Sequence, residues 1–309
     1  MIENAVTPPD QDLHLQVARA RTGDREALES VVRAVQKDVY GLALRFLWHP
    51  QDAEDASQEI LMRVIAGLPG FRGDSGFRTW VYRIACNKLL TLRKQRMEQQ
   101  SISFEDLGED LAGGLSDNAL SVESDHEAAL LLEEVKIGCT LAMLMCLDRN
   151  HRLAYILGEI VELDHRQAAA VLEISPAAFR KRVSRARASI ISFMASRCGL
   201  VNPANACRCR RRVTTAVDRG RVNPKGLLFA SSLDYANRFP EVLVRIRQLE
   251  ETRRAAALYK SHPNPTPSES FISWLRRVVD EKSDVHIDRG AAEPNIPLDG
   301  RPRAGNSSS

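Results

Sequence analysis

Residues 52–96 constrain the fold of this chain more than any other stretch. They contain two patterns of helical periodicity, 52–68 and 77–96, on either side of the short break GLPGFRGDSG. The first pattern opens with acidic residues and repeats apolar residues at the spacing of one buried helix face, namely Ala53, Ala56, Ile60, Val64 and Leu68. We therefore expect two helices that face each other within one helical domain.

The second pattern combines aromatic residues with cations and an amide: Phe77, Arg78, Trp80, Tyr82, Arg83, Asn87, Lys88, Arg93 and Lys94. Such a mixture suits a surface that holds a phosphate backbone and stacks on exposed bases. A simpler interpretation is that the aromatic residues are core residues of a helical bundle, and for any single one this is the better prediction. Trp80, Val81 and Ile84 are expected to include core positions.

The composition is that of an ordinary globular protein. The 309 residues suffice for two or three domains, and the net charge is only +3. No window has the unbroken apolar run that a membrane span requires, and residues 1–12 lack the apolar segment of a signal peptide. We expect a cytoplasmic protein with no membrane partner, whose six cysteines are free thiols or metal ligands rather than disulfides.

The near-neutral total conceals a strong segregation of charge. Residues 98–135 contain eleven acids and no Lys or Arg, whereas residues 175–225 contain thirteen Lys or Arg and the single acid Asp218. This alternation is typical of a nucleic-acid-binding protein with an acidic connector.

Periodicity and composition divide the chain into five parts and predict an all-α fold. Two helical domains, residues 13–96 and 126–197, are joined by a flexible acidic linker, residues 97–125. A mostly helical extension with cysteines follows at residues 198–287, and residues 288–309 are expected to be disordered.

The second domain ends in a pattern typical of a helix-turn-helix. A short Ala-rich helix, residues 164–172, is followed by a tight turn and a second helix that Ser175 caps, with Pro176 at its first position. Phe179, Val183, Ala186 and Ile190 share one face of the second helix, and the cations Arg180, Lys181, Arg182, Arg185 and Arg187 lie largely elsewhere. The pattern indicates DNA binding in the major groove; the alternative is a solvated basic helix on an ordinary helical domain.

These stretches together resemble an extracytoplasmic-function (ECF) sigma factor of bacterial RNA polymerase. The resemblance covers about residues 13–197 and has three parts in the expected order: ARARTGDREALESVVRAVQKDVYGLALRFL, DAEDASQEILMRVIAGLPGFRGDSGFRTWVYRIACNKLL and LDHRQAAAVLEISPAAFRKRVSRAR. It implies a region 2-like bundle, a region 4-like helix-turn-helix, and a protein that works with core RNA polymerase on promoter DNA. The middle motif is the specific one, since the helix-turn-helix alone fits many regulators.

The resemblance also implies roles for individual residues. The helix over residues 52–68 would dock on the polymerase clamp, through Asp52, Asp55, Gln58, Glu59 and Met62. The segment 71–80 would capture a base flipped from the minus-ten element and begin strand opening, with Phe71, Arg72, Phe77 and Trp80 as candidates. Asn87 and Lys88 would touch the same element, and the minus-thirty-five element would be read by Arg180, Lys181, Arg182 and Arg185.

Two positions depart from the family pattern. Glu173 stands in the turn of the helix-turn-helix where a small residue is usual, which places an acid near DNA. Trp48 and His49 stand where such proteins often have Gly and Asp, a change expected to affect only the loop.

The extension begins with a cysteine cluster, Cys198, Cys207 and Cys209, beside four arginines. Three interpretations stay open: a metal or redox sensor, incidental free cysteines, and an additional DNA or polymerase contact by the arginines. Tetrahedral zinc would require one more ligand, for which His262 or His286 is available, although no cofactor is required by the family. Cys86, Cys139 and Cys146 lie in helical patterns and are expected to be small buried hydrophobes.

The remaining helices of the extension contain no catalytic constellation, and no part of the chain has a phosphate-binding Gly-rich loop or a nucleophile motif. We therefore expect a non-enzymatic sigma factor whose extension folds onto the sigma-like domains and limits their access to polymerase or DNA. An anti-sigma factor is the alternative source of regulation. The alternative function is a stand-alone helix-turn-helix transcriptional regulator, which has no reason to carry residues 52–96.

Overall fold

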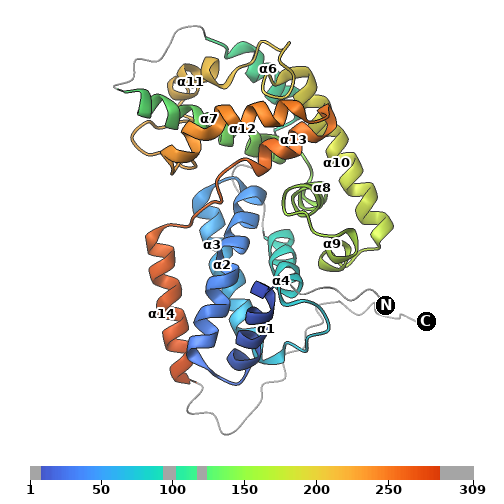
Figure 1. The fold of residues 1–309 in the computed structure, drawn as a ribbon, viewed down its shortest axis with the longest axis vertical. Helices are drawn as coiled ribbons and strands as arrows, with labels where there is room; N and C mark the ends of the chain where they lie inside the picture. Colours follow the sequence, from blue (N-terminus) through green and yellow to red (C-terminus); the bar gives the residue numbers. More distant parts are fainter. Residues whose placement is uncertain (1–7, 93–101, 117–123, 286–309) are drawn as a thin grey trace, which may run out of the picture.

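The computed structural model describes residues 8–92, 102–116 and 124–285, and the regular secondary structure of these residues is helical (Figure 1). An isolated bridge between Cys198 and Cys207 is the one β-type contact in this part of the chain. The predicted all-α class is confirmed.

The first domain forms the lower lobe in Figure 1, from α1 (Pro8–Arg21), α2 (Arg25–Leu47), α3 (Pro50–Gly67), the 3₁₀ turn η1 (Leu68–Gly70) and α4 (Phe77–Thr91). Helix α2 begins where the side chain of Asp24 accepts a hydrogen bond from the amide of Ala27 (3.0 Å). The apolar stripe of α2 is buried from Val31 to Phe46. Helix α4 ends at Thr91, whereas the sequence predicts a helix to about Arg96, and residues 93–96 lie outside the described residues.

The acidic connector contains a helix that the linker prediction missed. Helix α6 (Phe104–Gly113) begins with a capping box, in which the side chain of Ser103 accepts from the amide of Asp106 (3.0 Å) and Asp106 accepts from the amide of Ser103 (3.0 Å). Leu107 and Leu111 are buried, and the ring of Phe104 lies 5.3 Å from that of Phe193. The prediction of a wholly flexible linker is therefore wrong for these residues, because the apolar side of α6 packs on the second domain.

The second domain consists of α7 (Asp125–Met145), α8 (Arg149–Tyr155), a π-helical turn η2 (Ile156–Ile160), α9 (His165–Val171) and α10 (Pro176–Arg197). The long α10 packs on α8 and α9 and runs along one side of the molecule (Figure 1). Helices α9 and α10 form the predicted helix-turn-helix, and the spacing of their apolar residues explains the packing.

The extension is helical, as the sequence predicts, but its helices lie in two places. Helices α11 (Cys209–Asp218) and α12 (Leu233–Gln248) pack on α7, and α13 (Glu251–Lys260) packs on α10 and α12. Helix α14 (Glu269–Val285) lies apart from them, beside α2 and α3 (Figure 1). The predicted disordered tail, residues 288–309, lies outside the described residues.

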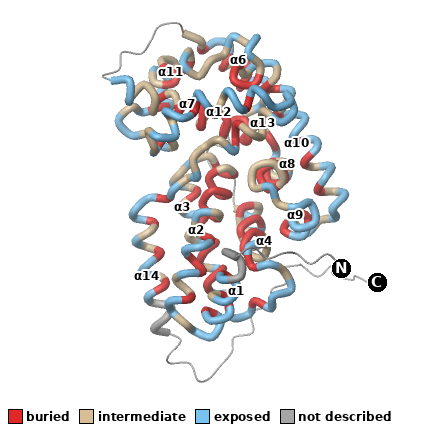
Figure 2. The backbone as a smooth tube through the Cα atoms, in the orientation of Figure 1, coloured by how far each residue is buried: buried red, intermediate tan, exposed pale blue. Residues whose placement is uncertain are grey.

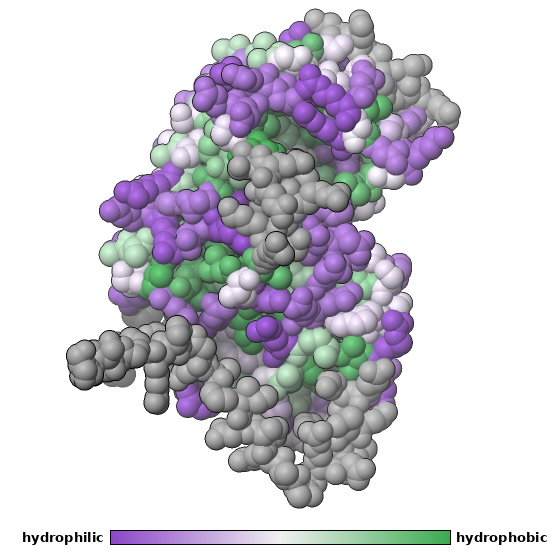
Figure 3. All heavy atoms as spheres, turned by 180° about the vertical axis from the view of Figure 1, so that it is seen from behind, coloured by the Kyte–Doolittle hydropathy of each residue, from purple (hydrophilic) through white to green (hydrophobic). Residues whose placement is uncertain are grey.

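One buried cluster of apolar side chains runs through both lobes, and buried segments line the inner side of each helix (Figure 2). Seen from behind, polar residues cover much of the surface, and apolar patches show between the two lobes (Figure 3). The two predicted domains are therefore packed against each other in this structure.

Candidate nucleic-acid interface

The recognition helix of the helix-turn-helix presents a basic, exposed face. Ser175 caps α10 by accepting from the amide of Ala178 (3.2 Å), and Pro176 occupies the first turn, as predicted. The apolar side of the helix is buried at Phe179, Val183, Ala186 and Ile190. Arg180, Lys181 and Arg185 are exposed, and Arg182 is half-buried. The structure thus brings the four predicted DNA-reading cations together at one end of α10.

Arg187 differs from the other cations of α10 because it has a partner within the domain. Its guanidinium forms an ion pair with Glu159 in η2, and this hydrogen bond raises the pKa of Arg187 above its usual range. Arg187 therefore stabilises the packing of the recognition helix on η2. Arg180 and Lys181 lie further towards the N-terminus of the helix.

The turn between α9 and α10 contains Glu173 in a left-handed conformation, with φ of +53°. The left-handed region normally favours glycine, which explains physically why a small residue is usual at this position. The amide of the next residue, Ile174, donates to the carbonyl of Ala169 (3.0 Å) and closes the turn. The side chain of Glu173 is exposed, so the turn forms in spite of the departure.

The aromatic residues near α4 form a compact cluster rather than an open platform. The ring centroids of Phe71, Phe77 and Trp80 lie 5.2–5.6 Å apart. Phe77 and Tyr82 are 2% and 7% exposed, so the core interpretation is correct for these two aromatic residues of α4. Phe71, predicted to capture a base, is 7% exposed, so in this structure neither its ring nor that of Phe77 is open to a base. Trp80 is half-buried and packs on Gly67, where a Cβ atom would lie 3.2 Å from its ring.

The polar candidates around α4 remain accessible to different degrees. Arg72 is exposed and pairs with Asp74 at 3.1 Å. Asn87 is exposed, whereas Lys88 is half-buried and forms an ion pair with Glu59 of α3. This ion pair therefore links Lys88, a predicted DNA contact, directly to Glu59, a predicted polymerase contact.

Helix α3 separates a buried side from an outward side. Ala53, Ile60 and Val64 are fully buried, as the periodicity predicts. The five candidates for polymerase binding face outward: Asp55 and Glu59 are exposed, and Asp52, Gln58 and Met62 are half-buried. The helix starts at Pro50 without a side-chain cap. Asp55 remains available to solvent and to a partner, whereas Glu54 accepts hydrogen bonds from Ser268.

Two arginines of α8 join the domains, and no local sequence pattern marks them. Arg152 is 3% exposed and donates to the carbonyl oxygens of Phe46 (2.7 Å), Leu144 (2.9 Å) and Leu147 (3.0 Å). Arg149 donates to the carbonyl of Leu92 (2.8 Å), just beyond α4. Carbonyl groups at helix C-termini lack partners within the helix, so the two guanidinium groups satisfy the ends of α2, α7 and α4 at once.

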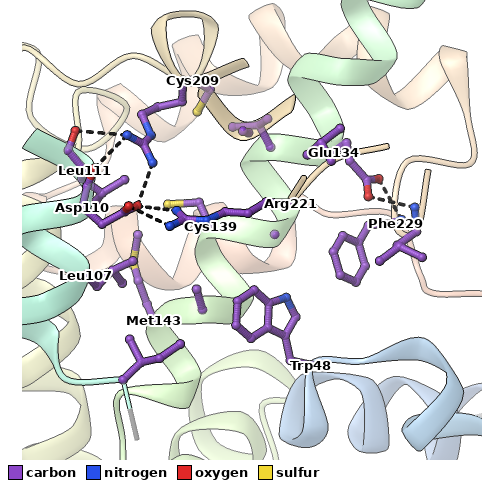
Figure 4. Close-up of a pocket in the computed structure, with 18 of the residues that line it drawn as sticks. Trp48, Leu107, Asp110, Leu111, Glu134, Cys139, Met143, Cys209, Arg221 and Phe229 are labelled. Atoms are coloured by element: carbon purple, nitrogen blue, oxygen red, sulfur yellow. Dashed lines mark hydrogen bonds and ion pairs between the residues drawn. The ribbon is translucent and has the colours of Figure 1, made fainter. Parts of the chain in front are cut away.

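The acidic α6 and the basic α11 are brought together by one carboxylate. Asp110 pairs with Arg212 (2.8 Å), Arg219 and Arg221, and these arginines hold the pKa of Asp110 below its usual value. Figure 4 shows Asp110 and Arg221 at the edge of a cavity of about 740 Å³ between α6, α7 and α11. An acid of the connector and three arginines of the basic stretch therefore pair with each other within the chain.

The cysteine cluster lines the same cavity and gains a fourth member. Cys139 of α7 lies with Cys198, Cys207 and Cys209 in the cavity wall, and all four are free. Burial raises the pKa of Cys198 and Cys207 in spite of the neighbouring arginines, contrary to the expectation that these cations activate the thiols. Within the described residues, no group of three or more His, Cys, Asp or Glu side chains is arranged to hold a metal ion. The zinc prediction therefore has no support from this geometry.

Comparison with known proteins agrees with the arrangement of helices and motifs. The model of Sigma-70 region 2 matches residues 31–98. The RNA polymerase sigma-H factor of Pseudomonas aeruginosa strain PAO1 is 33% identical over 184 residues, which are 59% of this chain and 92% of the relative. The ECF RNA polymerase sigma-E factor of Escherichia coli K12 is 30% identical over 177 residues, or 56% of this chain and 90% of the relative. The chain belongs to the ECF sigma factors of RNA polymerase.

This ECF sigma factor is longer than the relatives that it matches. The alignment to the sigma-H factor leaves roughly two fifths of the chain without a counterpart. A solved structure of CnrH in complex with the cytosolic domain of CnrY is also similar, with 25% identity, a TM-score of 0.41, and coverage of 58% of this chain and 95% of CnrH. No helix in the described part of the sigma factor is long and apolar enough to cross a bilayer.

Proposed function

We propose that this ECF sigma factor is a non-enzymatic promoter-specificity subunit that binds core RNA polymerase in the cytoplasm and directs it to promoters. The observation that carries the proposal is the pairing, in one chain, of the outward acidic face of α3 with the exposed basic face of α10. A factor that works only with polymerase requires both surfaces, one for the enzyme and one for DNA.

Helix α3 supplies the polymerase contact in this proposal. Asp52, Asp55, Gln58, Glu59 and Met62 lie on its outward side and match the family's docking helix. Acidic residues at the rim of such a surface steer a basic partner and favour fast association.

DNA is read at two places. Arg180, Lys181, Arg182 and Arg185 enter the major groove at the minus-thirty-five element, where long basic side chains reach phosphates and base edges. Asn87, Lys88, Arg72 and Trp80 act at the minus-ten element and promote melting, in which each unstacked base costs a few kcal/mol. Because Phe71 and Phe77 are buried, they support the loop from within unless the loop rearranges on DNA.

The extension regulates access to these surfaces. Helices α11–α13 are fixed to the second domain, since the carboxylate of Glu134 accepts from the amides of Leu228 (2.8 Å), Phe229 (2.8 Å) and Ala230 (2.7 Å), as Figure 4 shows in part. Self-inhibition by the extension and an anti-sigma factor remain the two sources of control.

A run-off transcription assay with purified core polymerase tests the function. Initiation from a cognate promoter is expected only when this chain is added. The alternative, a stand-alone helix-turn-helix regulator, predicts specific duplex binding without polymerase and no initiation in its presence. The exposed face of α10 alone would suit either function, and α3 distinguishes them.

A further inference from the structure

Helix α14 is held at both ends on the first domain. At its start, the amide of Ser268 donates to Oε1 of Glu54 in α3 (2.6 Å), and the hydroxyl of Ser268 donates to Oε2 (3.0 Å). Further along, Asp280 pairs with Arg25 at the start of α2 (2.5 Å). The helix thus follows the α2–α3 face along much of its length (Figure 1).

The contact between these ends is apolar. Phe271, Leu275 and Val279 recur every fourth residue, and each is at most 5% exposed. The ring of Phe271 lies 6.3 Å from that of Tyr40 in α2. Ser273, Arg276 and Arg277 face solvent on the other side. Helix α14 therefore packs as an amphipathic helix on the α2–α3 face of the first domain.

A short segment with three prolines leads from α13 to α14. Pro265 in this segment packs on Gly41 of α2, where a Cβ atom would lie 3.5 Å from its ring. Helices α11–α13 contact the second domain, whereas α14 and the proline segment before it reach the first (Figure 1). The segment acts as a tether, so α14 can leave the α2–α3 face without unfolding α11–α13.

The first domain has its core without α14. Helices α1–α4 pack on one another, and a relative matched over 92% of its length covers only 59% of this chain. The face under α14 is therefore available for another partner when the helix leaves.

The position of α14 indicates whether it restricts the access of polymerase or that of DNA. Glu54, its anchor, stands between Asp52 and Asp55 in the helix proposed to dock on polymerase, and Gln58 follows one turn later. In contrast, Arg180, Lys181 and Arg185 of the recognition helix stay exposed. Helix α14 therefore bears on polymerase docking through Glu54 and the adjoining face of α2, while Asp55 and Glu59 of the docking helix stay exposed beside it.

We propose that α14 is an intramolecular competitor of core RNA polymerase for the α2–α3 face. This inference rests on the proposed function. The apparent affinity for polymerase equals the affinity of the open form multiplied by the fraction of molecules in which α14 is not docked. If α14 is docked in about nine molecules of ten, its release strengthens polymerase binding about tenfold.

The test measures binding of full-length variants to core polymerase. Leu275→Asp places a charge in the buried contact and should release α14. Ser273→Asp adds the same charge on the solvent side and serves as the matched control. Ser268→Ala keeps the apolar contact and the bond from its backbone amide to Glu54. It removes the hydroxyl, which donates to Glu54 (3.0 Å) and caps α14 by accepting from the amide of Phe271 (3.2 Å). Release is followed independently by trypsin cleavage at Arg276 and Arg277.

We expect Leu275→Asp to bind polymerase about tenfold more tightly than the unmodified chain, Ser268→Ala about twofold to fivefold more tightly, and Ser273→Asp equally. Faster cleavage of α14 combined with unchanged affinity overturns the competition and leaves the sigma function intact. If Leu275→Asp loses its cooperative thermal transition, Ser268→Ala decides between these outcomes. If neither the unmodified chain nor any variant binds polymerase, the proposed function itself fails.

Discussion

The guanidinium of Arg152, in α8, donates a 2.7 Å hydrogen bond to the carbonyl oxygen of Phe46, in the last turn of α2. The two residues are 106 positions apart and belong to different domains. The same side chain also binds carbonyl groups at the end of α7, so one buried cation fixes the angle between the lobes. Helix α9, the first helix of the helix-turn-helix, lies against α4.

Arg152→Met should destabilise the protein by about 3 kcal/mol, because it leaves several buried carbonyl groups without donors. Equilibrium unfolding in urea measures the change. Arg166→Met, at an exposed position of α9, should change stability by less than about 0.5 kcal/mol. Equal losses in the two variants would show that the buried contacts add nothing.

Arg180→Ala and Arg185→Ala should each weaken promoter binding by the polymerase complex. Each should also make the logarithmic salt dependence of the affinity shallower by about one unit, because one phosphate fewer is neutralised and one counterion fewer is released. Affinity measured at several salt concentrations gives both quantities. Ser189→Ala, on the exposed part of the same helix, is the control. A salt dependence that is unchanged in both arginine variants would remove them from the DNA interface.

Asp55→Ala combined with Glu59→Ala should slow association with core polymerase about tenfold, since the docking face then lacks two exposed acids. Stopped-flow association measures the effect. Glu26→Ala, which removes an exposed acid from α2, should leave the rate within twofold. Because Glu59 is more than half exposed, its pair with Lys88 adds at most about 1 kcal/mol to stability, so altered folding does not explain a slower rate.

The protein should lose stability as the pH falls below about 6.5. His262, just beyond α13, is half-buried, and its Nε2 lies 3.3 Å from the hydroxyl of Thr140 in α7. Desolvation is the main cause that lowers its pKa well below the usual 6.5, and the nearby charges of Lys136 and Arg45 lower it further. Below about pH 6.5, His262 therefore binds a proton in the unfolded chain but not in the folded chain, so stability rises with pH until about 6.5. Melting temperatures from pH 5 to 8 measure this dependence, which His262→Gln should flatten and the exposed His49→Gln should not.

The zinc prediction is tested by metal analysis of the purified protein. If Cys198, Cys207 and Cys209 bind zinc, with His262 or His286 as the predicted fourth ligand or Cys139 of the cavity wall in its place, the unmodified protein should contain about one zinc per chain, and Cys207→Ser/Cys209→Ser should contain none. Binding would draw the four side chains of the cavity wall together and deprotonate thiols whose pKa burial now raises. Equal zinc contents in the two proteins would exclude the site, and Cys86→Ser is the control for loss of a buried thiol.

The sequence by itself determined the helices of the two sigma-like domains and the sides on which they are buried. The apolar stripes of α2, α3 and α10, the break at Pro50 and the cap at Ser175 are properties of stretches shorter than about 25 residues, in which backbone hydrogen bonds and side-chain spacing are local. These local rules also predicted the exposed cations of α10, because a cation is costly to bury without a partner.

The tertiary structure alone decided which distant groups meet. Asp110 contacts arginines more than a hundred positions away, Arg152 ends helices of both domains, and α14 returns to Glu54 across 214 positions. It also decided that Phe71 and Phe77 are core residues and that Cys139 joins the cysteine cluster. Charge and hydrophobicity specify the kind of partner that a side chain needs, but many residues satisfy that need. The packing of whole helices selects among them, because it fixes which surfaces are close enough to exclude water.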